Sequence, residues 1–152
     1  MSWEEYGRLE AVLVDNVKKA IAEKHEKIAM VFGIFRGGII LARSMVSRLG
    51  EIPLGILHPK QTAIGKLACM ADDDMNKLSE AKKKSMMVLL VDDISDTGMT
   101  FGAMKQCLCA HRFSKVYTAA LVVKPKSAFI PDFYAQEDPT DAWIVFPWEI
   151  GG

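Results

Sequence analysis

Short runs of apolar residues alternate along the chain with segments in which the apolar positions recur every three or four residues. Continuous runs rich in β-branched and aromatic residues are typical of buried strands, whereas the helical spacing is typical of helices that bury one face. The pattern predicts helices at 3–22, 37–50 and 99–112, and strands at 28–35, 52–57, 86–93, 115–124 and 142–146. Because strands and helices alternate, we expect an α/β fold with a mostly parallel central sheet and helices on both faces.

The length of the chain, 152 residues, predicts a single domain that spans residues 1–152. Residues 59–85 fit no long helix or strand and end in the polar run ADDDMNKLSEAKKKS. A stretch of this length without regular structure in a compact domain is either functional or disordered. We interpret 59–85 as a flexible flap over a binding site, and a plain disordered insertion is the alternative.

The charge of the chain is balanced, with 19 basic and 19 acidic residues, but it is unevenly distributed. Every lysine and arginine lies at or before Lys126, and the last 26 residues contain five acids. Nucleic-acid-binding proteins usually present a basic face, so we expect no nucleic-acid partner. We interpret the one dense basic run, AKKKS at 81–85, as a solvent-exposed face.

Several features bear on the location of the protein. No apolar stretch approaches the roughly 18 residues that indicate a membrane span. The N-terminal sequence MSWEEYGRLE has no feature of a signal peptide. The three cysteines are odd in number and lack the spacing of a zinc site, so we expect reduced thiols. Together these features predict a cytoplasmic protein without a membrane partner.

Ligands of open parallel sheets bind beyond the carboxyl ends of the strands. The predicted strands end at Phe35-Arg36-Gly37-Gly38, at the segment from Asp92 to Thr100, and at Lys124. All three strand ends are expected at the same edge of the sheet. We therefore expect the binding site there.

The segment VLLVDDISDTGMTF, residues 88–101, continues an apolar strand into three acids and a Thr-Gly-x-Thr turn. The turn precedes a predicted helix, whose first backbone N–H groups and dipole favour an anion. Gly98 lets the backbone approach a ligand closely, and Thr97 and Thr100 add hydroxyl donors. Taken alone, the turn is also compatible with an ordinary capped start of a helix.

Asp92 and Asp93 favour the interpretation as a ligand site. Adjacent carboxylates at the end of an apolar strand repel each other, and burial raises the free energy of both. A phosphorylated sugar with Mg²⁺ supplies partners for the acids and for the turn, because Mg²⁺ prefers oxygen ligands and substrate phosphates. The sequence has neither a P-loop nor a GxGxxG dinucleotide motif. A phosphoaspartyl enzyme with a strand-end aspartate as nucleophile is an alternative.

The run VLLVDDISDTGMT resembles the motif with which type I phosphoribosyltransferases bind phosphoribosyl pyrophosphate (PRPP). The resemblance extends from about residue 28 to the C-terminus. Within the family, VVKP at 122–125 and DAWIVFPWE at 141–149 are most similar to the short bacterial xanthine/hypoxanthine-guanine enzymes. The resemblance implies the type I fold with a small purine-binding hood at 125–152, a Mg²⁺ cofactor, and a homodimer or homotetramer.

The resemblance also implies roles for individual residues. The implied PRPP-binding residues are Arg36 and Gly37 at the pyrophosphate, Asp92 and Asp93 at the ribose hydroxyls, and Thr97, Gly98, Met99 and Thr100 around the 5′-phosphate. The implied purine-binding residues are Lys124 as donor to O6, Trp143 stacked on the base, and Ile144 through its carbonyl oxygen. Asp96 is the implied general acid/base near N7, and Asp92, Asp93 and Glu149 are the implied metal ligands.

The implied reaction is the transfer of ribose 5-phosphate from PRPP to N9 of hypoxanthine, guanine or xanthine, with release of pyrophosphate, in purine salvage. Two alternatives remain: a PRPP-binding regulatory protein and a phosphoribosyltransferase for another base. The neutral charge argues against the first, and Lys124 argues against adenine, whose 6-amino group is itself a donor. The sequence departs from the family in its flap, because LHPKQTAIGK at 57–66 contains no tyrosine.

Overall fold

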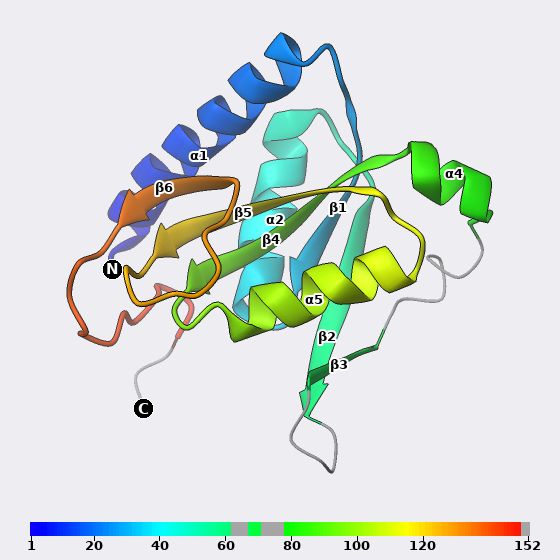
Figure 1. Cartoon of the computed structure of the whole chain (residues 1–152). Helices are drawn as coiled ribbons and strands as arrows, with labels where there is room; N and C mark the ends of the chain where they lie inside the picture. Colours follow the sequence, from blue (N-terminus) through cyan, green and yellow to red (C-terminus); the bar gives the residue numbers. More distant parts are fainter. Residues whose placement is uncertain (62–66, 71–77, 150–152) are drawn as a thin grey trace.

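The computed structural model of the protein describes residues 1–61, 67–70 and 78–149, with the side chains of 61 and 67–70 left out. The elements in chain order are α1 (Trp3–Glu23), β1 (Ile28–Ile34), α2 (Gly37–Leu49), β2 (Leu54–Gln61), β3 (Leu67–Met70), α4 (Glu80–Ser85), β4 (Met87–Ser95), α5 (Met99–Ala110), β5 (Lys115–Val123) and β6 (Phe133–Glu137) (Figure 1). The long helices and the first four predicted strands thus lie close to their expected positions.

The strands of the described part form one sheet in the order β3-β2-β1-β4-β5-β6. Neighbours from β2 to β6 pair in parallel, and β3 pairs antiparallel with β2 at one edge. Helices α1 and α2 cover one face of the sheet and α5 covers the other (Figure 1). The expected α/β fold with helices on both faces is confirmed.

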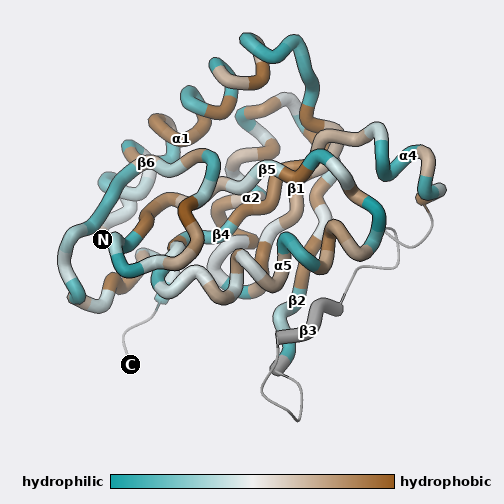
Figure 2. Tube along the Cα trace, viewed as in Figure 1, coloured by the Kyte–Doolittle hydropathy of each residue, from teal (hydrophilic) through white to brown (hydrophobic). Residues whose placement is uncertain are grey.

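The central strands bury apolar side chains on both faces, which explains why they appear in the sequence as continuous apolar runs. Val31 and Leu89 belong to the cluster beneath α1 and α2, whereas Phe32 and Leu90 belong to the cluster beneath α5. Consecutive strand residues point to opposite faces, so each strand contributes to both clusters. Figure 2 shows hydrophobic residues along these strands and on the helix sides that meet them.

The predicted strand at 142–146 is wrong. This segment has no strand structure, and the sheet edge beside β5 is occupied by β6, which the sequence pattern did not predict. The carboxylate of Asp132 fixes the start of β6, because its Oδ2 accepts hydrogen bonds from the backbone N–H and the hydroxyl of Thr118, both at 2.8 Å. The apolar residues of AWIVF have mixed surroundings, since Trp143 is 78% exposed whereas Phe146 is 3% exposed and belongs to the core cluster beneath α1 and α2.

The segment expected as a flap, 59–85, contains more regular structure than predicted. β2 extends to Gln61, and β3 and α4 also lie within the segment. The remaining residues, 62–66 and 71–77, lie outside the described part of the chain, so closure over the site stays a prediction.

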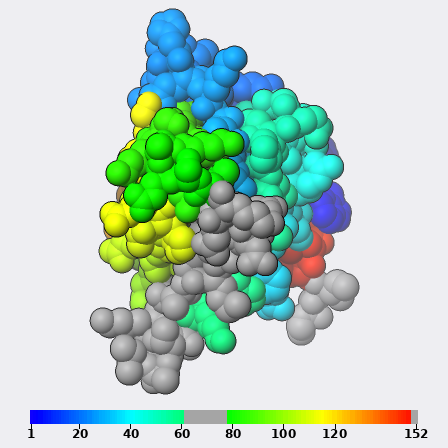
Figure 3. All heavy atoms as spheres, turned by 90° about the vertical axis from the view of Figure 1, so that its right-hand side faces the viewer, coloured from blue at the N-terminus to red at the C-terminus, as the bar shows by residue number. Residues whose placement is uncertain are grey.

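Helix α4 lies at the end of the molecule where β4 and β5 begin (Figure 1), and its residues face the viewer in Figure 3 (green). The hydroxyl of Ser114 donates to the carbonyl of Lys84 at 2.7 Å and so joins α4 to the start of β5. The basic run 81–85 is not wholly solvent-exposed as expected, because Lys83 is 7% exposed and lies 6.0 Å from the ring centre of Phe113. Its apolar stem lets a lysine pack in this way.

Two expectations about location meet different outcomes. None of the helices in the described residues is long and apolar enough to cross a membrane. Cys109 is a free, exposed thiol, but Cys107 is disulfide-bonded, so the expectation of reduced thiols is wrong for Cys107.

Candidate active site

Three cavities adjoin one another at the carboxyl ends of β1, β4 and β5. The first has a volume of about 220 Å³ and the second about 600 Å³, and Asp93 and Glu149 line both. The third has a volume of about 240 Å³ and shares Asp96 with the first. Twelve of the residues named from the sequence meet at this edge of the sheet. Those lining a cavity are Arg36, Gly37, Asp92, Asp93, Asp96, Thr97, Gly98, Thr100, Lys124, Trp143, Ile144 and Glu149.

Strand β4 continues to Ser95, two residues beyond its predicted end, so Asp92 and Asp93 lie within the strand rather than at its end. Burial, followed by the charge of Asp93, raises the pKa of Asp92 well above its usual range. Burial also raises the pKa of Asp93, and the nearby Glu149 adds to the effect. Both shifts have the direction expected for carboxylates that are partly buried beside other acids.

The loop after β1 lies directly against this acid pair. A Cβ atom on Gly37 would lie 1.7 Å from Oδ2 of Asp93, so only glycine fits beside the carboxylate. A Cβ atom on Gly38 would lie 2.5 Å from the carbonyl oxygen of Val91 in β4. The Phe35–Arg36 peptide bond is cis, and the exposed side chain of Arg36 lines the 600 Å³ cavity. The loop therefore brings a guanidinium group next to the acids.

The turn after β4 forms the third cavity. Gly98 has φ of 84°, in the left-handed region, and precedes the first turn of α5. A Cβ atom there would lie 2.4 Å from the backbone nitrogen of Phe129, so a side chain would be both strained and in contact. Thr97 and Thr100 line the cavity, whereas Met99 is 67% exposed. The start of a helix beside a glycine turn is suited to a phosphate group.

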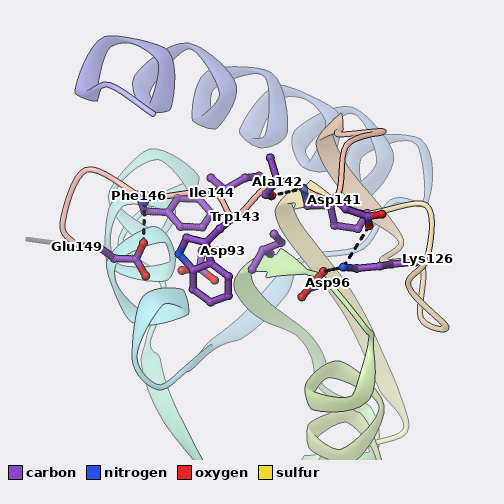
Figure 4. A pocket seen from close by; sticks show the side chains of 11 residues that line it. Asp93, Asp96, Lys126, Asp141, Ala142, Trp143, Ile144, Phe146 and Glu149 are labelled. Atoms are coloured by element: carbon purple, nitrogen blue, oxygen red, sulfur yellow. Dashed lines mark hydrogen bonds and ion pairs between the residues drawn. The ribbon is translucent and has the colours of Figure 1, made fainter. Parts of the chain in front are cut away.

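The first cavity is lined by the segment that had been expected as a strand. Figure 4 shows Glu149 and Phe146 at one end of the cavity and Asp96, Lys126 and Asp141 at the other, with Trp143 between them. The carboxylate of Glu149 accepts a hydrogen bond from the backbone N–H of Phe146 at 2.9 Å, which fixes this end. An exposed, rigid indole beside such a cavity is suited to stacking on a planar ligand.

Lys124 lines the same cavity but is 3% exposed and already has partners. Its Nζ donates to Oδ2 of Asp138 at 2.5 Å, to the carbonyl of Thr140 at 2.7 Å and to the carbonyl of Ala142 at 2.9 Å. The ammonium charge of Lys124 and the amide and hydroxyl of Thr140 lower the pKa of Asp138 to about 2. Lys124 therefore holds the segment 138–142 in place, and its contact with a ligand stays a prediction.

Sequence reasoning missed Lys126 and Asp141. Nζ of Lys126 lies 3.2 Å from Oδ1 of Asp96 and 3.4 Å from Oδ1 of Asp141, and all three side chains line the first cavity (Figure 4). The signal was present, because Lys126 is the last basic residue of the chain and follows Lys124 at the same strand end. The sequence alone, however, does not show which of these two neighbouring lysines has a side chain that can reach a ligand in the cavity.

The carboxylates of Asp92, Asp93 and Glu149 fit a magnesium ion by their chemistry, since hard oxygen ligands and excess negative charge are what this ion requires. The described residues contain no group of three acidic, histidine or cysteine ligands that could hold a metal by themselves. This is the usual situation for an ion that takes its other ligands from substrate phosphates and water.

Comparisons with known proteins identify the family of the chain. The model of the phosphoribosyl transferase domain matches residues 2–151. The chain is similar to the purine phosphoribosyltransferase of Pyrococcus horikoshii, with 28% identity, a TM-score of 0.83, and coverage of 100% of this chain and 94% of that one.

Two further structures share the fold at lower identity. The xanthine-guanine-hypoxanthine phosphoribosyltransferase of Helicobacter pylori is 21% identical, with a TM-score of 0.69 and coverage of 98% and 91%. A hypothetical protein from Neisseria gonorrhoeae with bound ppGpp is 22% identical, with a TM-score of 0.76 and coverage of 98% and 87%. The family expected from the sequence is confirmed: the chain belongs to the phosphoribosyltransferases.

Proposed function

We propose that this enzyme transfers the 5-phosphoribosyl group of PRPP to N9 of a 6-oxopurine and releases pyrophosphate. The observation that carries the proposal is the arrangement of the three cavities, which meet at Asp93 and Asp96. The first cavity has the exposed indole of Trp143 and suits a base. The second has Arg36 and suits a pyrophosphate, and the third lies at the start of α5 and suits a 5′-phosphate. One ribose would join these three groups.

PRPP would lie across two of the cavities. The 5′-phosphate accepts hydrogen bonds from backbone N–H groups at the start of α5 and from the hydroxyls of Thr97 and Thr100. The pyrophosphate lies beside Arg36, whose planar guanidinium suits phosphate oxygens. Asp92 and Asp93 lie between the two cavities and accept hydrogen bonds from the ribose hydroxyls.

Asp92, Asp93 and Glu149 would hold Mg²⁺, which supplies positive charge for the departing pyrophosphate when it is bound. Arg36 adds a second positive charge on the same side. Asp92 and Asp93 also hold the ribose in a fixed orientation, so that its anomeric carbon faces the base.

The base would enter the 220 Å³ cavity and stack on Trp143. The carbonyl oxygen of Ile144 is the expected acceptor for a 2-amino group. Asp96 accepts the proton from N7 as N9 forms its bond to the anomeric carbon, an effect that is typically worth about 10²- to 10⁴-fold in rate. Positive charge develops on the ribose ring as pyrophosphate leaves, and the carboxylates around it stabilise that charge.

A panel of bases tests the proposal. The protein is mixed with Mg²⁺, PRPP and hypoxanthine, guanine, xanthine, adenine or a pyrimidine, and nucleotides and pyrophosphate are followed by chromatography. We expect IMP, GMP or XMP from the 6-oxopurines. No product from any 6-oxopurine would contradict the proposal, and product from adenine alone would assign a different base.

Three accompanying expectations remain proposals. The first is that the protein acts as an enzyme without a nucleic-acid partner, against the alternative of a PRPP-binding regulator. Retention of labelled RNA or DNA with a steep salt dependence would favour the regulator. The others are a homodimer or homotetramer, which light scattering measures, and a cytoplasmic location.

A further inference from the structure

Two buried serines join the turn that follows β4 to the loop that follows β5. Ser95 is 1% exposed and Ser127 is 8% exposed, and their Oγ atoms lie 2.9 Å apart. Each hydroxyl also lies 2.8 Å from the carbonyl oxygen of Phe129, which has lone pairs for both protons. The backbone N–H of Phe129 donates in turn to Oγ of Ser127 at 3.2 Å. Both hydroxyl protons therefore have acceptors within the protein, as buried polar groups require.

Backbone hydrogen bonds hold the same loop, residues 124–129, against the turn. The N–H of Lys124 donates to the carbonyl of Ser95, and the N–H of Ala128 donates to the carbonyl of Thr97, both at 2.9 Å. Ser95 and Thr97 line the third cavity, where the proposed function places the 5′-phosphate. The loop therefore forms the outer support of that cavity.

The hydrogen bond from Ala128 fixes the direction of one amide in the turn. The Thr97–Gly98 peptide bond is trans, so its carbonyl oxygen and its N–H point in opposite directions. Because the carbonyl of Thr97 faces Ala128, the N–H of Gly98 points away from the loop and is left for a ligand in the cavity that Gly98 lines. A donor that is already held in its binding orientation loses little freedom when the ligand arrives.

We infer that Ser95 and Ser127 are positioning residues for the 5′-phosphate, because their hydroxyls fasten the loop 124–129 to the turn and so keep the amides of the turn aimed at that group. This inference rests on the proposed function. The serines act through the loop, since their protons are taken up by Phe129. The ring of Phe129 stacks on that of Phe101 in α5 with centres 5.4 Å apart, so loop, turn and helix are joined in one unit.

Calorimetric titration of the full chain with two ligands tests this inference without relying on catalysis. Ribose 5-phosphate carries the phosphate that the turn should bind, whereas pyrophosphate with Mg²⁺ should bind beside Arg36 in another cavity. In Ser95→Ala, the affinity for ribose 5-phosphate should fall by about 3- to 10-fold, the effect of one lost hydrogen bond, while the affinity for pyrophosphate stays nearly constant. Ser127→Ala should act in the same way, and the double variant should lose less than the product of the two factors, because the hydroxyls act together.

Ser114→Ala is the matched control, because the hydroxyl of Ser114 also donates to a backbone carbonyl, that of Lys84, at the end of the sheet where β5 begins. It should change neither affinity. A Ser95→Ala protein with unchanged affinity for ribose 5-phosphate, or with equal losses for both ligands, would overturn the positioning role.

The base panel separates this inference from the proposed function. If the unmodified protein binds ribose 5-phosphate but forms no nucleotide from any base, the proposed transfer fails, and a selective loss in Ser95→Ala would still support the role of the two serines. An unmodified protein that does not bind ribose 5-phosphate would overturn this inference.

Discussion

Gly98 and Gly102 lie one helical turn apart and have opposite structural requirements. Gly98 is in the left-handed region with φ of 84° and has the backbone of Phe129 where a side chain would be. Gly102 is inside α5, and nothing lies within 4 Å of the position of its Cβ atom. The first glycine is required by the turn, whereas the second is not required by anything in its surroundings.

We expect Gly98→Ala to lower the free energy of unfolding by about 1–2 kcal/mol from the backbone conformation alone. The contact with Phe129 adds to this loss and should also raise the KM for PRPP. Gly102→Ala is the control and should raise the free energy of unfolding by roughly 0.5–1 kcal/mol, because alanine favours a helix interior. Urea unfolding measures both. Equal effects of the two substitutions would contradict the assigned geometry of the turn.

Trp143 provides a second prediction at the residue scale. Because its side chain is 78% exposed, Trp143→Ala should change stability by less than about 0.5 kcal/mol. Stacking on a base is worth about 1–3 kcal/mol, so the KM for the purine should rise by roughly 5- to 100-fold. The KM for PRPP should stay nearly constant, and Trp143→Phe should recover part of the loss. Steady-state kinetics with each substrate varied in turn would separate the two effects.

At the scale of elements, strand β6 and the segment 138–149 that follows it are held in place by different interactions. Strand β6 is bound to β5 by backbone pairing, whereas residues 138–142 are held by hydrogen bonds to the ammonium group of Lys124. The ring of Phe146 stacks on that of Trp148 with centres 5.0 Å apart, and Trp148 contacts Tyr6 of α1. The segment 138–149 is therefore held by the buried ammonium group of Lys124, by this aromatic cluster, and by the N-terminal ammonium group of Met1, which donates to the carbonyl of Val145 at 2.9 Å.

The pair of Lys124 and Asp138 predicts a specific dependence of stability on pH. The pKa of Asp138 is lowered to about 2 in the folded protein, below its usual value near 3.9 in an unfolded chain. Its contribution to stability is thus present above about pH 4 and is lost as the pH falls towards 2. Asp138→Asn should be less stable than the unmodified protein at pH 6, and the difference should shrink between pH 4 and 2.

Urea unfolding of both proteins across this range measures the effect, and only the difference between them is assigned to Asp138. A difference that stays constant down to pH 2 would contradict the assignment. Asp141→Asn is a suitable control, because Asp141 is 91% exposed and contacts Lys126 rather than Lys124.

The sequence pattern predicted the elements whose apolar residues are buried on regular faces. Strands β1, β4 and β5 and helices α1, α2 and α5 are of this kind. It failed for residues 142–146, because an apolar run whose tryptophan serves a cavity has the same composition as a buried strand. It also missed β6, whose sequence FYAQE is partly polar because the strand lies at the sheet edge.

The candidate site was predictable where a motif determines the position of each residue. The order of acids, threonines and glycine between Asp92 and Thr100 requires one strand end and one helix start, so their grouping followed directly. The contacts between residues far apart in the sequence could not be predicted in this way. The contacts of Lys124 with Ala142 and of Lys126 with Asp141 depend on how the hood folds back, which neither spacing nor composition determines.

At the scale of the whole molecule, we expect the acids of the site to lower the stability of the free protein, because burial raises the pKa of both Asp92 and Asp93. Asp93 is partly buried, and burial raises its pKa to about 6, with a further increase from the charge of Glu149. Between about pH 4 and 6 the folded form holds a proton that the unfolded chain has lost, so stability falls as the pH rises through this window. Above about pH 6, Asp93 is ionised in the folded protein, and the burial of its charge lowers the free energy of unfolding.

Asp93→Asn should therefore raise the free energy of unfolding at pH 7.5, by roughly 1–2 kcal/mol. The same substitution should abolish transferase activity, because Asp93 lines both of the cavities in which the proposed function places the base and the pyrophosphate. Urea unfolding and the base panel measure the two effects on one preparation. A less stable Asp93→Asn protein would show that the carboxylate is already compensated by groups of the protein itself.

Binding of Mg²⁺ and PRPP should compensate for the burial of the Asp93 carboxylate. At 100 times its dissociation constant, Mg²⁺ with PRPP should stabilise the protein by about 2.7 kcal/mol, seen as a higher melting temperature. PRPP with EDTA should give a much smaller increase, and EDTA alone should leave the melting temperature of the free protein unchanged. An equal increase with and without the metal would contradict the assignment of the carboxylates as ligands.

The hydrogen bonds that Lys124 makes to Asp138, Thr140 and Ala142 have a consequence for how the base specificity of such a protein can evolve. Residues 138–142, which line the cavity proposed for the base, are anchored by this one ammonium group and lie outside the paired strands that carry Asp92 and Asp93. We therefore expect substitutions in this segment to change which base is accepted while leaving the proposed PRPP site intact. On the proposed function, a chimaera that exchanges only residues 139–148 with those of a relative of different selectivity, and so keeps Asp138 and Glu149, should show the donor's base preference and the recipient's KM for PRPP.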